Sequence, residues 1–461
     1  MSTKVTKIGI TKDKISSRGG ITLFLKYVEH AQVYGLIGHC INGLIKKISR
    51  GLQLNEFIIQ IMAFIIDGTN MSMKRFDELK KDTGYITSLE LKESQMASSH
   101  AMKRFFKKLS IINDLIFNKI LHELFVWRLK ISNQEIIILG IDTMVLDNDD
   151  APKREGCEVT YKKKKGFQPL HICWGKYLID VVFRKGSAHS NHGTDFTDRV
   201  AAVVNLIRKR YNSDVAIILC ADSGFFDQKA MAYFEKELKI HYIITGKMYQ
   251  DVKDDLSKSD EQSYKEIRKN KAVWKYIEIG HKLKSWDKYR RCIVTKLFTD
   301  EKGQFLLDFS RPDTILYTNI GICPDADQRL TSCGGEQYFN ADTIIETAHQ
   351  RGADELIHRS IKELAVKEQL PFEKFGMNRA YYFFLVFTHF LQEAYKNDVC
   401  KDVLPVSSYP NTFRRVMIDF AAKFTIKSRN LILNVSKGIY DQINLSKIWN
   451  LCHTPIKIQW E

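Results

Sequence analysis

Two aspartates stand at the ends of short apolar runs in this sequence. Residues 136–142, IIILGID, end in Asp142, and residues 215–222, VAIILCAD, end in Asp222. Uninterrupted apolar runs of this length are typical of buried strands, and α/β sheets bind ligands at the carboxyl ends of their strands. Two carboxylates at that edge would bind a divalent cation such as Mg²⁺, which prefers oxygen ligands. The alternative is that each aspartate only binds turn amides or caps the next helix.

A third acid for such a site is predicted on a helix within residues 343–364. Because a helix turns about 100° per residue, one face of this segment gathers four charged or titratable residues. They are Arg351, Glu355, His358 and Lys362. A carboxylate between cations can bind a metal while the cations bind phosphates, and three carboxylates would support phosphoryl transfer with two metal ions. The alternative is a solvent-exposed face with ion pairs between residues four apart.

The choice of Asp142 as the first acid depends on the register of its strand. Three more aspartates follow it, at Asp147, Asp149 and Asp150. We interpret them as a polar loop, but one of them would be the first acid if the register were different.

The segments around these acids alternate between strand and helix patterns. We expect strands at residues 136–142, 166–175, 178–184, 215–222 and 241–246, and helices at 195–211 and 227–238. This order predicts an α/β fold with a mixed sheet and flanking helices. Helical spacing before residue 130 indicates an α-helical N-terminal domain, and short alternating strands between 248 and 337 indicate a β-rich insertion. Towards the C-terminus we expect a basic helix at 412–424.

The charge balance indicates a polyanionic partner. Lys plus Arg number 70 and Asp plus Glu number 54, so the 461-residue chain has a formal net charge of +16. Nucleic acid is the default interpretation, and an anionic membrane surface is the competing one. The longest apolar stretches, 57–66 and 381–391, are shorter than the ~20 residues that span a bilayer, so we expect no membrane insertion. Nine cysteines without a Cys-x-x-Cys pair fit reduced thiols in a cytoplasm.

Two clusters of cations are candidates for contacts with DNA phosphates. The predicted helix AMKRFFKKL, residues 101–109, carries Arg104 among three lysines. A run of four lysines, with Lys163 and Lys164 at its centre, precedes Gly166. Contacts of this kind make affinity dependent on salt. The alternative for both clusters is a solvent-exposed face or turn.

With these residues in place, the sequence resembles the DDE transposases of bacterial insertion sequences, in the hairpin-forming subgroup with a β-strand insertion in the catalytic domain. The resemblance covers about residues 20–440. GIDTMVLDND and CADSGFFD resemble the two aspartate segments of that family. HQRGADELIHRSIKEL matches the signature Tyr-x-x-Arg-x-x-x-Glu-x-x-x-x-x-x-Lys at Arg351, Glu355 and Lys362. The Tyr position holds Ala348 instead, which bears on the positioning of the DNA end and not on the metal site.

The resemblance implies an RNase H-like fold and a specific site. Asp142, Asp222 and Glu355 would be the catalytic acids and the ligands of Mg²⁺, with Mn²⁺ able to replace it. Arg351 and Lys362 would contact DNA. Water would cut the DNA strand at the transposon end, the freed 3′-hydroxyl would form a hairpin with the other strand, and after reopening it would attack target DNA.

The resemblance also implies partners and a location. The partners would be double-stranded DNA, as terminal inverted repeats and target DNA, and a second copy of the chain in a homodimer that pairs two ends. The expected location is the bacterial cytoplasm, at the nucleoid.

Trp286 is a further candidate for a DNA contact. It lies in a basic stretch of the predicted β-rich insertion. A hairpin-forming enzyme has to relieve strain by flipping a base, and an indole is a stacking surface for one. The alternative is a tryptophan that packs inside the β-rich segment.

The expected domains follow from these patterns together with the resemblance. They are a helical N-terminal domain that binds terminal repeats (1–130), a first part of the catalytic domain (131–250), the β-rich insertion (251–337), a second catalytic part (338–400), and a C-terminal segment with dimer or DNA contacts (401–461). The alternative functions are a catalytically inactive or domesticated protein that occupies transposon ends, or another RNase H-like nuclease.

Overall fold

The computed structural model describes residues 4–43, 51–69, 71–188, 195–269, 271–283, 286–306, 313–350, 352–366 and 368–461, and only the backbone of residues 261, 313 and 352–355. The chain forms two compact units, each made of separate segments. The helical unit consists of Met1–Glu123, Leu146–Cys157 and Arg359–Glu461. The sheet unit consists of Leu124–Val145 and Glu158–His358.

The sheet unit is built on a nine-stranded mixed sheet with the order β10-β11-β12-β13-β9-β8-β2-β6-β7. The pairs β2–β8 and β8–β9 are parallel, and the other neighbours are antiparallel. The strands are β2 (Ile136–Thr143), β6 (Leu170–Trp174), β7 (Tyr177–Val182), β8 (Ala216–Ala221), β9 (His241–Thr245), β10 (Lys265–Lys269), β11 (Ala272–His281), β12 (Arg290–Thr299) and β13 (Asp313–Thr318). The predicted RNase H-like mixed sheet with flanking helices is confirmed, and strands β10 to β13 of the β-rich segment extend the same sheet.

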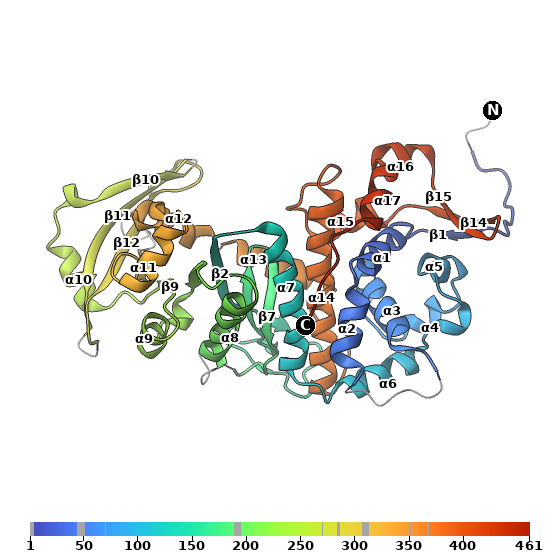
Figure 1. The fold of residues 1–461 in the computed structure, drawn as a ribbon, viewed down its shortest axis with the longest axis horizontal. Helices are drawn as coiled ribbons and strands as arrows, with labels where there is room; N and C mark the ends of the chain where they lie inside the picture. Colours follow the sequence, from blue (N-terminus) through green and yellow to red (C-terminus); the bar gives the residue numbers. More distant parts are fainter. Residues whose placement is uncertain are drawn as a thin grey trace. The chain divides into compact units, whose positions relative to one another are not determined.

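One face of this sheet is covered by α11 (Pro324–Ser332) and α12 (Ala341–Gln350), which lie beside the strands in Figure 1. Alternate residues of β8, from Ala216 through Ile218 to Cys220, pack there with Ile344 and other apolar side chains of the two helices. Side chains alternate between the two faces of a strand, so Asp222, two positions after Cys220, lies on this face as well. Burial of the apolar residues therefore also determines the face on which the strand-end acids lie.

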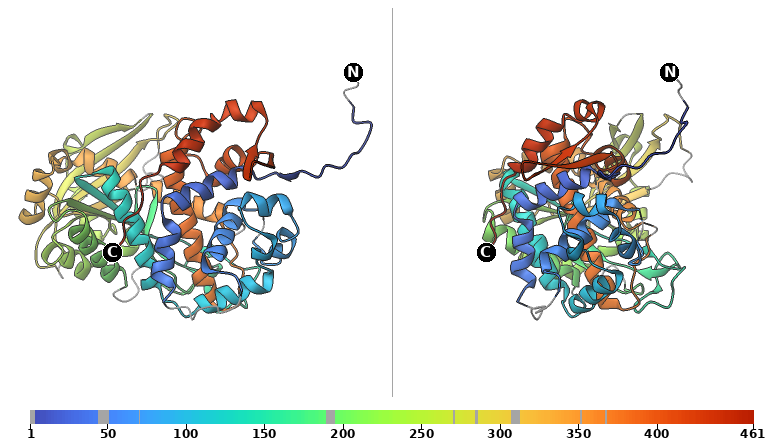
Figure 2. Two further views of the ribbon diagram at one scale, coloured as in Figure 1. Left: turned by 45° about the vertical axis from the view of Figure 1, so that its right-hand side comes forward. Right: turned by 90° about the vertical axis from the view of Figure 1, so that its right-hand side faces the viewer.

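The helical unit is organised around α14 (Phe375–Tyr395), whose side chains are buried from Ala380 onwards. It contacts α3 (Leu54–Asp67) and α6 (Ser99–Leu109), and the blue N-terminal helices lie beside this orange helix in Figures 1 and 2. A helix that is apolar on all sides is either a buried core helix or a membrane span. Among the described residues, none of the helices is both long enough and apolar enough to cross a bilayer.

The C-terminal part differs from the sequence prediction. The expected basic helix at 412–424 is wrong: α15 (Pro410–Phe413) and a π-helical turn (Arg414–Ile418) end before a strand, β14 (Ala422–Lys427). Ala422 and Phe424 are buried while Lys423 is exposed, which is the period of a strand and not of a helix. β14 lies between β1 (Lys14–Ser16) and β15 (Asn430–Asn434), so its pairing with β1 depends on residues about 400 positions away.

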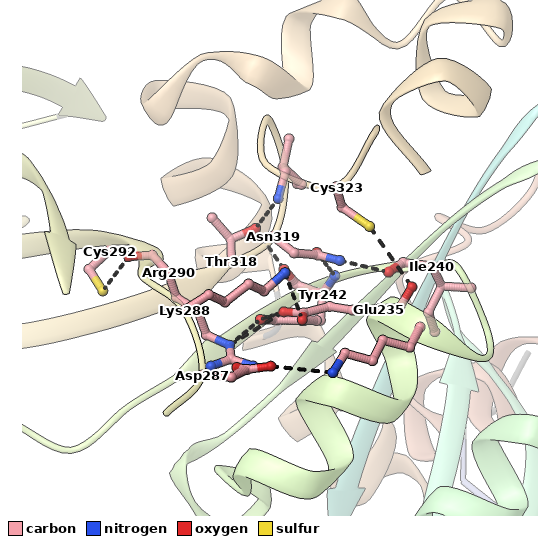
Figure 3. A network of polar contacts seen from close by, with 12 residues as sticks. Glu235, Ile240, Tyr242, Asp287, Lys288, Arg290, Cys292, Thr318, Asn319 and Cys323 are labelled. Carbon is pink, nitrogen blue, oxygen red and sulfur yellow. Dashed lines mark hydrogen bonds and ion pairs between the residues drawn. The ribbon is translucent and has the colours of Figure 1, made fainter. Parts of the chain in front are cut away.

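A buried polar network joins strand β12 to the rest of the sheet unit (Figure 3). The Arg290 side chain is fully buried; its Nε lies 3.3 Å from Glu235 Oε1 and donates to the Tyr242 hydroxyl at 3.2 Å. The Tyr242 hydroxyl in turn donates to Glu235 at 2.6 Å, and Lys288 Nζ lies 3.0 Å from the same carboxylate. Burial and the Glu235 charge raise the pKa of Tyr242 well above its ordinary value. Glu235 is thus the carboxylate that compensates the buried Arg290.

We expect Glu235→Gln to lower the free energy of unfolding by about 3–5 kcal/mol, because it leaves the Arg290 charge buried without a counter-charge. Urea denaturation measures the change. Glu237→Gln, at the exposed end of the same helix, is the matched control and should cost less than about 0.5 kcal/mol. Equal stability of the two variants would show that the network does not hold β12 in place.

Candidate active site

The register of two parallel strands brings Asp142 and Asp222 together. In the pairing of β2 with β8, Ile141 lies opposite Ala221, so the next residue of each chain segment is one of the two aspartates. Both aspartates lie at the carboxyl ends of their strands and on the sheet face covered by α11 and α12. This is the juxtaposition that the sequence predicted, and it leaves Asp147, Asp149 and Asp150 beyond the end of β2 at Thr143.

Backbone amides orient both carboxylates. The amide of Thr143 donates to Asp142 Oδ1 at 2.7 Å, and the amide of Gly224 donates to Asp222 Oδ1 at 2.8 Å. Asp222 therefore also binds a turn amide, as the alternative interpretation expected, whereas Asp142 binds the amide of the next residue of its own strand. A hydrogen bond at one oxygen fixes the rotation of the carboxylate without preventing it from binding a cation.

Two histidines adjoin Asp142. His171 of β6 pairs with Asp142 across the strands, and its Nδ1 lies 3.3 Å from Nε2 of His358. His358, on α13 (Gly352–Leu364), has its Nδ1 4.0 Å from Asp142 Oδ2. The helix therefore approaches the strand end at His358. Glu355 precedes His358 by three residues, so the two positions fall on the same side of this helix.

The side chain of Glu355 lies outside the described residues. Among the side chains that are described, no three acidic, histidine or cysteine residues are grouped closely enough to bind a metal ion. The donors present are nevertheless of the right kind for a hard divalent cation, since Asp142 and Asp222 offer carboxylate oxygens at adjacent positions. A third carboxylate from the Glu355 turn would complete an oxygen-ligand set.

The lysine run lies on a hairpin beside the two acids. Strands β4 (Glu158–Val159) and β5 (Lys165–Phe167) flank an exposed turn in which the Thr160 hydroxyl donates to the Lys164 carbonyl at 2.8 Å. Lys163 has a positive φ of 58° in this turn and is exposed. Burial, and then the carboxylates of Asp142 and Asp222, raise the pKa of Tyr161. The phenol thus lies within the electrostatic field of both acids.

A cavity of about 670 Å³ lies on this sheet face. Its walls include Gly140 and Cys220, which precede Asp142 and Asp222 by two residues, and Leu356 of α13. A space of this size is in the range of small-ligand pockets. Neither aspartate lines the cavity, whose wall along β2 runs from Gly140 back to Gln134, away from the carboxyl end of the strand.

The remaining predicted residues lie in different places. Arg351 lies outside the described residues. In the helical unit, Lys362 forms an ion pair with Glu368 at 2.9 Å, and Arg104 is exposed on α6. Ala348, at the signature Tyr position, packs against the apolar core of the sheet unit.

Trp286 packs inside the sheet unit, as the second interpretation expected. Its side chain is 4% exposed, and the Arg290 guanidinium lies 4.8 Å from its ring centroid. The rings of Phe226, His281 and Tyr317 surround it at 5.4–6.0 Å. A DNA base can stack on this indole only after the surrounding residues move.

Sequence reasoning missed His171 and Tyr161. His171 stands inside an apolar strand, where a lone histidine resembles an ordinary core residue. Tyr161 directly precedes the lysine run, and an aromatic residue beside a cationic cluster was the available signal for it.

Comparison with known proteins gives one family match. A family model described as Transposase DDE domain group 1 matches residues 2–454. Among curated proteins no match was found. Among solved structures, the chain is similar to the piggyBac transposase in a synaptic complex with hairpin DNA, at 12% identity over 88% of this chain and 82% of that chain, with a TM-score of 0.41.

We expect Trp286→Ala to lower the free energy of unfolding by about 3–5 kcal/mol, because it empties a buried aromatic position. Trp286→Phe, which refills most of that volume, should cost clearly less. Thermal and urea unfolding of the two variants measure this order. Wild-type stability of the alanine variant would contradict a core role and restore base stacking as the sole role.

Proposed function

Because the chain belongs to the Transposase DDE domain group 1 family, we propose that it cuts and joins DNA at the ends of a mobile element. The substrate is double-stranded DNA with terminal inverted repeats, and the reactions are hydrolysis and transesterification of phosphodiesters. The observation that carries the proposal is the register of β2 and β8, which makes Asp142 and Asp222 neighbours at one sheet edge. The contact of His358 with Asp142, one helical turn from Glu355, supports the same site.

The proposed catalytic residues are Asp142, Asp222 and Glu355. They would hold Mg²⁺, or Mn²⁺ in its place, and the bound metal would stabilise charge on the attacking and leaving oxygens of an in-line displacement at phosphorus. The amides of Thr143 and Gly224 keep the two aspartates oriented for this role.

Cationic side chains hold the DNA backbone at the proposed site. Lys163 and Lys164 stand on the exposed turn beside the acids, where they attract phosphates in a manner that depends on salt and not on base sequence. Arg351 and, on α13, Lys362 have the same proposed role. For Lys362 this means exchanging its ion pair with Glu368 for a phosphate.

One site can perform each step because every step replaces one P–O bond by another. Hydrolysis at the transposon end breaks a phosphodiester and frees a 3′-hydroxyl. That hydroxyl attacks the opposite strand, forming a hairpin and releasing the flanking DNA. Water reopens the hairpin, and the regenerated 3′-hydroxyl attacks a phosphodiester of the target and displaces a target 3′-oxygen.

The proposed assembly is a homodimer that pairs two ends and acts on DNA in the bacterial cytoplasm, at the nucleoid. A single site acts on one end at a time, so two copies give coordinated cleavage of both ends. The helical unit would supply contacts with the terminal repeats.

The substitution at the signature Tyr favours a second candidate function. Ala348 offers no hydroxyl or ring to a DNA phosphate, so a copy that binds ends without cutting them is the competing proposal. Binding and cleavage therefore have to be measured separately.

We expect Asp142→Asn, Asp222→Asn and Glu355→Gln each to abolish cleavage of the DNA that natively flanks the coding sequence, with less than a few-fold change in binding. Asp149→Asn is the matched control, since it makes the same change just beyond β2. Cleavage in Mg²⁺ is followed on labelled DNA ends and binding by gel shift. Retained cleavage in any of the three variants would show that its acid is misassigned.

In cells, excision of the flanked segment by the wild type and not by Asp222→Asn would establish the transposase activity. Binding of the ends by a wild type that cuts none of them would support the competing proposal of an inactive copy.

A further inference from the structure

A cationic groove of about 440 Å³ lies in the helical unit, and none of the proposed catalytic residues is among the described residues that line it. Three separate segments of the chain contribute one cation each. They are Lys74, between α3 and α4 (Arg75–Leu79), Lys103 of α6, and Arg154 of the segment 146–157. Thr69, Ser72 and Gln369 add polar groups to its walls. None of the described residues that line the groove is acidic.

The charges of the groove are not neutralised within the described part of the chain. Lys74 and Lys103 are exposed and form no ion pair with a described residue. Arg154 is partly buried and donates from Nη1 to the neutral Asn148 side chain at 2.9 Å, and burial lowers its pKa. Bringing three like charges around one hollow is unfavourable unless an anion is bound there.

The arginine is held in place before any ligand binds. Asn148 is fully buried; its Oδ1 accepts from Arg154 and from the amide of Leu370, and its Nδ2 donates to the carbonyl of Glu368. It therefore ties the arginine to the segment that forms another wall of the groove. A cation fixed in this way loses little side-chain entropy on binding an anion.

The chemistry of the walls selects phosphate over base. Among the side chains that the structure describes, no aromatic ring lines the groove, so they offer no surface on which a base would stack. Cations with hydroxyl and amide groups are the usual partners of phosphate oxygens. In a chain with a net charge of +16, the anion with several phosphates in a row is a nucleic acid backbone.

We infer that this groove binds backbone phosphates of the DNA end, with Lys74, Lys103 and Arg154 as the contacting cations. The inference rests on the proposed function and adds to it a binding site in the helical unit. It also places the phosphate contact of α6 at a different cation from the one chosen from the sequence. Lys103 lines the groove, whereas its neighbour Arg104 does not.

The two neighbours on α6 give a matched pair of variants. Lys103→Gln and Arg104→Gln remove one charge each from exposed positions of the same helix. Binding of the full-length protein to a duplex of the natively flanking DNA is measured as a function of NaCl concentration. We expect Lys103→Gln and Lys74→Gln each to reduce the slope of log K against log salt by about 0.9 and to weaken binding equally for end and unrelated sequences.

Arg104→Gln should leave the slope unchanged. Arg154→Gln should act like Lys103→Gln, and the two lysine variants carry the test if loss of Arg154 disturbs folding. A slope in Lys103→Gln equal to that of the wild type, or an equal drop in Arg104→Gln, would overturn the groove as a phosphate site.

Three further outcomes separate the possible explanations. If inorganic phosphate raises the melting temperature of the wild type but not of Lys103→Gln, while DNA binding by the two is the same, the groove takes a free anion and the inference is wrong. If the wild type excises its flanked segment and binds its ends, but the groove variants behave like Arg104→Gln, only the groove fails. A wild type that neither binds nor cuts the ends would contradict the proposed function as well.

Discussion

The parallel pairing of β2 with β8 determines where the acidic residues of this protein lie. Ile141 lies opposite Ala221, and a slip by one residue would move one aspartate to the other face of the sheet. Burial fixes this register, because alternate residues of β8 pack with α11 and α12 in one apolar core. Each apolar side chain of that core contributes about 1.5–3 kcal/mol. The energy that folds the sheet thus also holds the two carboxylates side by side.

Placing two carboxylates side by side has an electrostatic cost that shapes the rest of the site. Like charges at adjacent positions repel, and a divalent cation between them offsets the repulsion. The amides of Thr143 and Gly224 stabilise the same charges. Exposed lysines stand on the neighbouring turn, so a polyanion is attracted to the region where the metal is proposed to bind. The carboxylates thus favour a divalent cation, and the neighbouring lysines favour DNA.

The sequence alone was sufficient to predict those structural features whose residue pattern is local. A continuous apolar run ending in an acid predicted both strand ends, and α3 ends at Gly68, whose left-handed φ of 59° suits glycine. It was insufficient where contacts are distant in the chain. The strand at 422–427 pairs with the N-terminal residues, and the burial of Trp286 depends on Phe226 and Tyr317. The choice between Lys103 and Arg104 required the groove, which three separate segments form.

The most direct test of the central claim is a change of metal preference in Asp222→Cys. A thiolate is a softer ligand than a carboxylate, and Mn²⁺ accepts it more readily than Mg²⁺ does. We predict that Asp222→Cys fails to cut the flanking DNA in Mg²⁺ and regains cleavage in Mn²⁺, while Asp149→Cys cuts in both. Equal cleavage by Asp222→Cys in the two metals would contradict a role of this residue as a metal ligand, and with it the proposed site.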